Sequence, residues 1–384
     1  MRINHDLSIC CIILTYNEER CIERCLKSVT QLFDDVIVID TGSKDNTLNI
    51  ISNYESDIKL YNYVWRDSFA EARNFGISKC TSDIIFFVDA DEFFEKNMTY
   101  EVLHNKISSV KKRLFNRTVI SPMIYDVGTN QVHKDIPRIF LNCGELKYYG
   151  DVHEEIRCKK QIVKYENIDL VMFHDGYIEE VLHKKKKMER NIRYLENMRN
   201  KEPNNLRWIY FYVRDGMKII KLEKLIDLIK DNIFLDAKNN IIKDNLVSDK
   251  YTFRILQLLC KLYILRGEYT SAIDLAKQMN SLFGTNIDTL YFSYLATFLN
   301  LKKTLNDLYV EIVSYRKNNH DEINSKISSE GYHIDLLIAF LLYEKGDYKN
   351  SEKFLKYLEN KFNDELTVKL INFYLNKINN YNCK

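Results

Sequence analysis

Residues 84–92 read IIFFVDADE, and this stretch decides the fold. Five uncharged apolar residues predict a buried strand, and the acidic run Asp89 to Glu92 follows where that strand ends. In an open parallel sheet, ligands bind beyond the carboxyl ends of the strands. We therefore expect a binding site immediately after residue 88.

The same pattern repeats on the N-terminal side of this stretch. Short β-rich runs at residues 8–14, 35–40, 58–64 and 83–88 alternate with amphipathic helical windows at 19–31, 47–54 and 69–79. This alternation is typical of parallel strands joined by crossover helices. Residues 118–173 read as strands with turns, and almost everything after residue 176 reads as helix. We predict an α/β domain at residues 1–180 and an all-α domain at 181–384.

Composition narrows the class of protein. The 384 residues are 46% hydrophobic, which is ample for real cores, and the formal net charge is only +2. A nucleic-acid binder that works through global charge is thereby disfavoured. Nine cysteines without a CxxC pair fit a reduced, cytoplasmic protein. We expect no signal peptide and no transmembrane segment.

The helical part contains an internal repeat. Arg266-Gly267-Glu268-Tyr269 is followed by Ala272, and Lys345-Gly346-Asp347-Tyr348 is followed by Ser351 at the same spacing. A small residue three places after the tyrosine lets paired helices approach closely. The spacing resembles tetratricopeptide units with an insertion. An irregular helical bundle is the alternative.

Three polar loops follow the predicted strands and should share one edge of the sheet. They begin at Thr15, at Asp40 and at Asp89. Carboxylates two residues apart, as in Asp89 and Asp91, can both turn toward one hard cation that bridges a diphosphate. Acidic pairs also cap helices, which is the ordinary alternative.

These motifs resemble those of family 2 glycosyltransferases. The resemblance rests on the segments ILTYNEE (13–19), VIDTGSKDNT (38–47), FAEARN (69–74) and DADE (89–92), in that order. It continues through PRIF (137–140), GDVHEE (150–155) and HDGY (174–177) into the helical part. The layout is similar to the subgroup with a tetratricopeptide-like tail, which includes the bacteriocin peptide S-glycosyltransferases.

The resemblance implies a GT-A, Rossmann-like domain and an inverting, metal-dependent transfer of a hexose from a UDP-sugar. The donor is expected at Thr15, Tyr16, Asn17, Glu18, Asp40, Arg73, Asp89 and Ala90. Mn²⁺ or Mg²⁺ is expected at Asp91, helped by Asp89, with His174 or His153 completing the site. Glu154, with Glu155 as the alternative, is expected to be the base that takes the proton of the acceptor.

The acceptor is the more open half of the prediction. Helical repeats form concave surfaces suited to extended peptides, so we expect a peptide or protein acceptor that offers a Cys thiol or a Ser hydroxyl. Dimerisation is the competing use of the repeats. Three other functions are weighed: a polysaccharide glycosyltransferase, a nucleotidyltransferase, and a binding scaffold with an inactive front domain. The loop at residues 15–20 has no Gly-rich phosphate motif, which disfavours the nucleotidyltransferase.

Overall fold

The computed structural model describes residues 7–54, 56–115, 117–129, 131–159, 162–175, 181–235, 245–318, 330–362 and 365–382, with residues 181–186 and 382 described for their backbone alone. Contacts divide the chain into two units, residues 1–220 and 221–384. The predicted front domain, residues 1–180, lies within the first unit, which also contains helices α6 (Val181–Lys201) and α7 (Leu206–Gly216).

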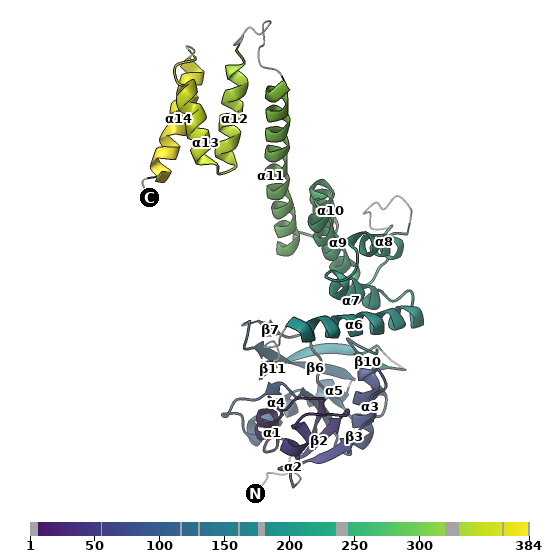
Figure 1. The fold of residues 1–384 in the computed structure, drawn as a ribbon. Helices are drawn as coiled ribbons and strands as arrows, with labels where there is room; N and C mark the ends of the chain where they lie inside the picture. Colours follow the sequence, from purple (N-terminus) through teal and green to yellow (C-terminus); the bar gives the residue numbers. More distant parts are fainter. Residues whose placement is uncertain are drawn as a thin grey trace. The chain divides into compact units, whose positions relative to one another are not determined.

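The first unit is built on a nine-stranded mixed sheet (Figure 1). Its parallel half has the order β3-β2-β1-β4 and consists of β1 (Ile9–Thr15), β2 (Asp35–Asp40), β3 (Lys59–Asn62) and β4 (Ile84–Asp89). The order continues through β8 (Ile139–Leu141), β6 (Thr118–Asp126), β11 (Lys164–His174) and β5 (Glu92–Phe93), with β7 (Val132–His133) paired to β6. β8 runs antiparallel to β4. A separate hairpin contains β9 (Leu146–Tyr149) and β10 (Glu155–Cys158).

Side chains that alternate along β1 form the cores on the two faces of the sheet. Ile9, Cys11 and Ile13 belong to one buried cluster, whereas Cys10 and Ile12 belong to another. The first cluster includes residues of α1 (Ile22–Val29), α2 (Thr47–Ser52), α4 (Tyr100–Ser109) and α5 (Lys111–Phe115). The second includes residues of α3 (Phe69–Lys79) and of the β9–β10 hairpin. Such two-faced burial explains why these strands are continuously apolar.

The second unit is helical throughout its described residues (apart from a single bridge between Phe234 and Leu246). Its helices are α8 (Leu222–Ile233), α9 (Thr252–Arg266), α10 (Tyr269–Phe283), α11 (Ile287–Asn318), α12 (Tyr332–Glu344), α13 (Tyr348–Leu358) and α14 (Glu365–Asn382). The predicted fold class, an α/β domain followed by an all-α domain, is therefore confirmed. None of the described helices has the length and apolar character that crossing a bilayer requires.

The internal repeat forms two matching helix hairpins, α9–α10 and α12–α13. Gly267 and Gly346 follow the first helix of each hairpin with positive φ values of 78° and 84°. This left-handed conformation ends a helix without strain only for glycine. Ala272 and Ser351 are fully buried in the second helices. The small residues therefore serve the close helix packing that the sequence predicted.

Candidate active site

The loops after β1 and β2 are joined by hydrogen bonds at the carboxyl edge of the sheet. The backbone N–H of Asn17, a residue with a φ of 55°, donates to Ser43 Oγ at 2.9 Å. Asn17 Oδ1 accepts from the backbone N–H of Lys44 at 2.7 Å, and Thr47 Oγ1 accepts from the N–H of Glu18 at 2.8 Å. These bonds fix the predicted donor-binding segment 15–18 in one conformation.

Two buried polar side chains lie at the floor of these loops. The Asp40 carboxylate accepts hydrogen bonds from the backbone N–H groups of Gly42 and Ser43, at 2.8 and 3.0 Å. Thr15 pairs with Asp40 in the strand register, and its buried hydroxyl has no hydrogen-bond partner in the described part of the chain. Tyr16, by contrast, is 52% exposed. The end of β1 therefore presents the hydroxyl of Thr15 and, on the next residue, the solvent-accessible ring of Tyr16.

Asp89, at the end of β4, is held by two arginines. Arg73 Nη2 donates to its Oδ1 at 3.0 Å, and Arg138 Nη2 donates to its Oδ2. Arg138 also donates to Glu92 Oε1 at 2.7 Å, and Glu92 Oε2 accepts from the backbone N–H of Asp89 at 2.8 Å. Ala90, in the same loop, is packed into the core. Both oxygens of Asp89 are thus engaged by guanidinium groups.

The charges of this cluster shift the protonation of its members. Burial acts to raise the pKa of Asp89, but the charges of Arg138 and Arg73 outweigh it and hold that pKa well below its usual range. Burial raises the pKa of Glu92 to about 7, against the opposing charge of Arg138. Burial disfavours the charge of Arg73, yet Asp89 and Glu154 more than compensate and raise the pKa of Arg73. The arginines therefore stay charged inside the protein.

Asp91 faces His174. Strand β5 pairs with the end of β11 in a register that sets His174 opposite Glu92, beside the acidic loop. His174 Nε2 lies 3.1 Å from Asp91 Oδ2, and His174 Nδ1 lies 3.9 Å from the buried carboxylate of Asp126. The hydrogen bond to Asp91 raises the pKa of His174. The structure thus brings together two of the predicted metal ligands.

Glu154 approaches the same arginine from the β9–β10 hairpin. Arg73 Nε donates to Glu154 Oε1 at 2.6 Å, so one guanidinium joins Glu154 to Asp89. The next residue of α3, Asn74, fixes the hairpin by exchanging two hydrogen bonds of 2.9 Å with the backbone of Tyr148. The predicted FAEARN motif therefore positions the hairpin through its last two residues.

Glu155 and His153 have different surroundings. Glu155 lies between two arginines, with Oε1 at 3.0 Å from Arg157 Nε and Oε2 at 3.3 Å from Arg207 Nη1. His153 Nε2 lies 2.7 Å from Asp215 Oδ2 on α7, and its ring stacks on Phe211 with centroids 4.2 Å apart. Of the two predicted histidines, His174 is the one that contacts Asp91.

Gly150 makes the turn that delivers this loop. Its φ is +111°, and a Cβ atom there would lie 2.6 Å from the ring of Trp208, which is fully buried. Arg207 Nη2 donates to the carbonyl oxygen of His153 at 2.6 Å. Helix α7 therefore fixes the loop that carries Glu154, although it lies beyond the predicted front domain.

Several buried donors in this region have no hydrogen-bond partner among the described residues. Beside the Thr15 hydroxyl, these are Arg73 Nη1, Arg138 Nε and the Tyr148 hydroxyl. Arg73 lies over the ring of Tyr148, with its guanidinium carbon 5.3 Å from the ring centroid. An unsatisfied buried polar group costs about 1–3 kcal/mol, so a concentration of them marks a place where a ligand or water is expected.

Sequence reasoning assigned no role to Arg138, Glu92 or Tyr148. Arg138 lies in the PRIF motif and Glu92 in the DADE motif, so the sequence did mark both positions. Their contacts were not predictable, because Glu92 and Asp89, the partners of Arg138, lie 46 and 49 residues away from it. Gly176 and Tyr177 of the HDGY motif lie outside the described residues.

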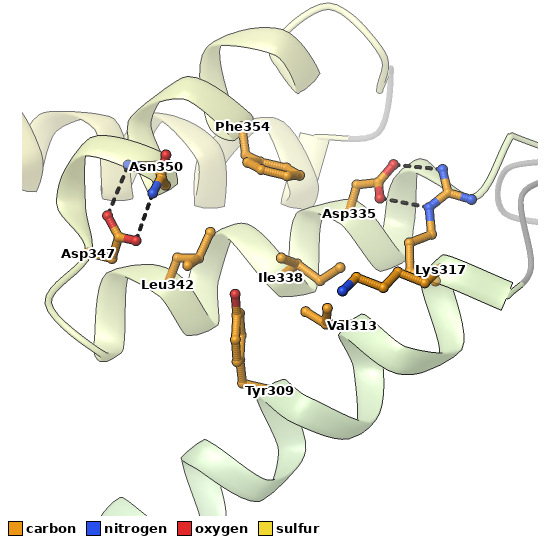
Figure 2. A pocket seen from close by; sticks show the side chains of 10 residues that line it. Tyr309, Val313, Lys317, Asp335, Ile338, Leu342, Asp347, Asn350 and Phe354 are labelled. Carbon is orange, nitrogen blue, oxygen red and sulfur yellow. Dashed lines mark hydrogen bonds and ion pairs between the residues drawn. The ribbon is translucent and has the colours of Figure 1, made fainter.

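A cavity of about 460 Å³ lies between α11, α12 and α13 of the second unit (Figure 2). Val313, Ile338, Leu342 and Phe354 give it apolar walls. At one end Arg316 pairs with Asp335 through two bonds of 2.7 and 2.8 Å. None of the predicted site residues lines this cavity. All the residues that line this cavity belong to the second unit.

Part of the chain matches a known protein family, and most of it is similar to a known glycosyltransferase. The model of the family described as "Glycosyl transferase family 2" matches residues 10–137. The SPbeta prophage-derived glycosyltransferase SunS of Bacillus subtilis is 30% identical over 302 residues, which are 78% of this chain and 69% of SunS. A TPR repeat-containing protein of Synechococcus elongatus is 30% identical over 152 residues, which are 39% of this chain and 35% of that protein.

Two solved structures also align with the chain. S. aureus TarS 1–349 in complex with UDP-GlcNAc has 13% identity and a TM-score of 0.40, over 73% of this chain and 93% of that one. M. tuberculosis glucosyl-3-phosphoglycerate synthase, in complex with Mn²⁺, UDP and glucosyl-3-phosphoglycerate, has 14% identity and a TM-score of 0.34, over 47% of this chain and 75% of that one.

Proposed function

Because the chain belongs to the family 2 glycosyltransferases, we propose that it moves a hexose from a UDP-sugar to a peptide or protein, with inversion at the anomeric carbon. The observation that carries this proposal is the double contact of Arg73. Its guanidinium bonds to Asp89 at the end of β4 and to Glu154 in the hairpin loop, and no described residue accepts a hydrogen bond from its Nη1. The Arg73 guanidinium thus links the acidic loop that begins at Asp89, which is expected near the diphosphate, to Glu154, which is expected to be the base.

The donor is proposed to lie over the loops after β1, β2 and β4. Thr15 and Asp40 form the floor for the nucleoside, and the exposed ring of Tyr16 is available for stacking on the base. Arg73 Nη1 and Arg138 Nε, which have no hydrogen-bond partner among the residues that the structure describes, suit the negatively charged diphosphate and the sugar hydroxyls. Asp89 then acts through the two arginines, whose positions it fixes.

Asp91 and His174 are proposed to hold the divalent cation. His174 Nε2 and Asp91 Oδ2 are 3.1 Å apart, so both side chains would be in reach of one ion. No group of three or more metal-ligating side chains occurs in the described part of the chain. Mg²⁺ and Mn²⁺ sites of this kind are completed by phosphate oxygens and water. The ion, when bound, neutralises charge that develops on the departing diphosphate.

Glu154 is proposed as the base. As the sulfur or oxygen of the acceptor bonds to the anomeric carbon, the acceptor proton passes to the Glu154 carboxylate, and the bond from that carbon to the UDP oxygen breaks. Arg73 holds the Glu154 carboxylate in place through the 2.6 Å bond. Glu155, which forms ion pairs with both Arg157 and Arg207, is suited to holding the loop.

The peptide acceptor is supported by the second unit. Its matching hairpins resemble peptide-binding helical repeats, and the cavity between α11, α12 and α13 has apolar walls that suit a side chain of an extended peptide (Figure 2). A Cys thiol, with a pKa near 8.5, demands less of a carboxylate base than a Ser hydroxyl does.

The test is an assay of the purified protein with a panel of UDP-sugars and Mn²⁺, with and without a chelator. Donor hydrolysis is scored first, followed by mass shifts of peptides that differ only in carrying Cys or Ser. Asp91→Asn and His174→Gln should each abolish turnover, whereas His153→Gln should retain it. Metal-independent turnover would refute the cation site. Transfer to oligosaccharides but not to peptides would establish the polysaccharide alternative.

A further inference from the structure

Two arginines converge on Asp175, the residue that follows His174. Arg20, just before α1, donates from Nη1 and Nη2 to the two carboxylate oxygens of Asp175 at 3.2 and 3.3 Å. Arg24, in the first turn of α1, places its Nη1 2.6 Å from Asp175 Oδ2. We call Arg20, Arg24 and Asp175 the Asp175 cluster. Its place directly after β11 sets it beside the proposed cation site.

The Asp175 cluster differs from an ordinary surface ion pair. Only 13% of the Asp175 side chain is exposed, and both of its oxygens are engaged, one of them by both arginines. Isolated pairs between exposed side chains contribute little to stability, because water screens the charges and the side chains lose freedom. Bidentate bonds to a shielded carboxylate restrict direction as well as distance. The cluster can therefore hold neighbouring segments in a defined arrangement.

Arg24 contacts both strands that flank the proposed cation site. Its guanidinium carbon lies 4.1 Å from the ring centroid of Phe93 on β5, and its Nη1 pairs with Asp175 directly after β11. The backbone N–H of Asp175 also donates to the carbonyl oxygen of Asp91 at 3.3 Å. One arginine and one aspartate thus connect α1, the acidic loop and the end of β11.

Backbone pairing supports His174 better than it supports the acidic loop. On the β6 side, the carbonyl oxygen of His174 accepts from the N–H of Val127 at 2.9 Å, next to the long parallel pairing of β11 with β6. On the other side, β5 consists of Glu92 and Phe93 alone and lies at the edge of the sheet. A two-residue edge strand opens more easily than a central strand. Contacts between side chains are therefore needed to keep Asp91 in register with His174.

We propose that Asp175 is a positioning residue of the cation site: its ion pairs keep the acidic loop against the end of β11, so that Asp91 faces His174. This inference rests on the proposed function, in which these two residues hold the divalent cation. Replacing a residue that orients a metal ligand without touching the metal typically changes metal affinity by about 10–100-fold. Asp175 acts in this way and not as a ligand, since the arginines occupy both of its oxygens.

The test is the affinity of the full chain for Mn²⁺, measured from the EPR signal of the free ion in the presence of UDP. Asp175→Asn removes the charge at nearly constant volume and should raise the Kd for Mn²⁺ by about 10–100-fold. The Kd for UDP without metal, measured by calorimetry, should stay nearly constant, whereas a general loss of structure would weaken both. Asp35→Asn is the matched control, because its carboxylate is 15% exposed and pairs with Lys59 at 2.8 Å, but Asp35 begins β2 at the amino edge of the sheet. It should leave both constants unchanged.

Arg24→Gln tests the same contact from the other side, at a side chain that is 41% exposed. It should also raise the Kd for Mn²⁺. The double variant D175N/R24Q should bind Mn²⁺ about as weakly as D175N alone, because changes that act through one contact are not additive. Hydrogen exchange gives a metal-free readout: the amides of residues 92–93 and 173–175 should exchange faster in D175N, whereas those of β1 should not.

The outcomes separate this inference from the proposed function. Wild-type affinity for Mn²⁺ in D175N would refute the positioning role and leave the cation site standing. Equal losses of affinity for Mn²⁺ and for metal-free UDP, or an equal loss in D35N, would also refute it, because the effect would not be specific to the cation site. A wild type that binds no Mn²⁺ would refute the cation site of the proposed function, and the positioning role with it.

Discussion

Replacing Glu154 by Gln separates the two roles proposed for this side chain. The amide keeps an oxygen that can accept the Arg73 Nε–H now bonded at 2.6 Å, and Arg73 remains paired with Asp89. The structural cost should therefore be only about 1–2 kcal/mol. The amide cannot take a proton, so kcat at pH 7 should fall by about 10²–10⁴.

The pH dependence of the variant then reports on the acceptor. A thiol of pKa about 8.5 is about 3% ionised at pH 7 and about 76% ionised at pH 9. If the acceptor is a Cys peptide, E154Q should regain about 25-fold in rate over this interval. A Ser hydroxyl does not ionise in this range, so a Ser peptide should show no such recovery. The measurement is single-turnover transfer followed by mass spectrometry at several pH values.

E155Q is the matched control, since Glu155 is the neighbouring carboxylate and is equally shielded from solvent, with 14% of its side chain exposed against 13% for Glu154. It loses a charge between Arg157 and Arg207, so it should lower the melting temperature but leave kcat within a few-fold. The reasoning is refuted if E154Q stays within five-fold of wild type at pH 7, or if E155Q is the inactive variant.

Further predictions concern binding and stability. Y148F removes a buried hydroxyl to which no described residue is hydrogen-bonded, so stability should hold while the KM for the UDP-sugar rises about 3–10-fold. G150A combines a φ of +111° with a clash against Trp208 and should cost about 2–4 kcal/mol in urea unfolding. Arg157, by hydrogen bonding, lowers the pKa of Glu202 to about 2. The ionised Glu202 carboxylate therefore contributes its full stabilisation above the unfolded pKa of about 4.5, and this stabilisation is lost as the pH falls toward 2. E202Q should accordingly lower the free energy of unfolding by about 1 kcal/mol at pH 7 and leave it unchanged near pH 2.

Each of these has a control. Y148L separates the hydroxyl from the ring, because it should lose stability as well as affinity. G144A is the control for G150A, since Gly144 has a φ of +73° but open space around its Cβ position, and should cost only about 1 kcal/mol. An E202Q deficit that is constant from pH 7 to pH 2 would show that lost packing, not lost charge, causes it.

The parallel half of the fold was predictable because its signals are local. Buried strands such as Ile84–Asp89 are continuous apolar runs, and α3 begins and ends at the predicted residues Phe69 and Lys79. The insertion of β8 between β4 and β6 was not predictable. Three residues, Ile139–Leu141, carry no pattern that says which strand they will join or in which direction.

The same distinction applies to the site. Asp89 and Asp91 follow a strong strand, and their place in the sequence was enough to predict them as site residues. The environments of Glu154 and Glu155 could not be told apart, because they depend on arginines supplied by α3 and α7. The surroundings of His153 likewise depend on Asp215, 62 residues later. Spacing along the chain identifies residue types, whereas side-chain partners are decided by tertiary packing.

The contact between Asp91 and His174 also has a consequence for the synthesis of the protein. These residues are 83 positions apart, and Arg73 and Glu154 are separated by 81. The four parallel strands β1 to β4 can therefore leave the ribosome before either of these two contacts can form. A nascent chain that stops before β11 would carry the acidic loop without its histidine. Premature termination in this region should accordingly yield an inert product and never a partly active one.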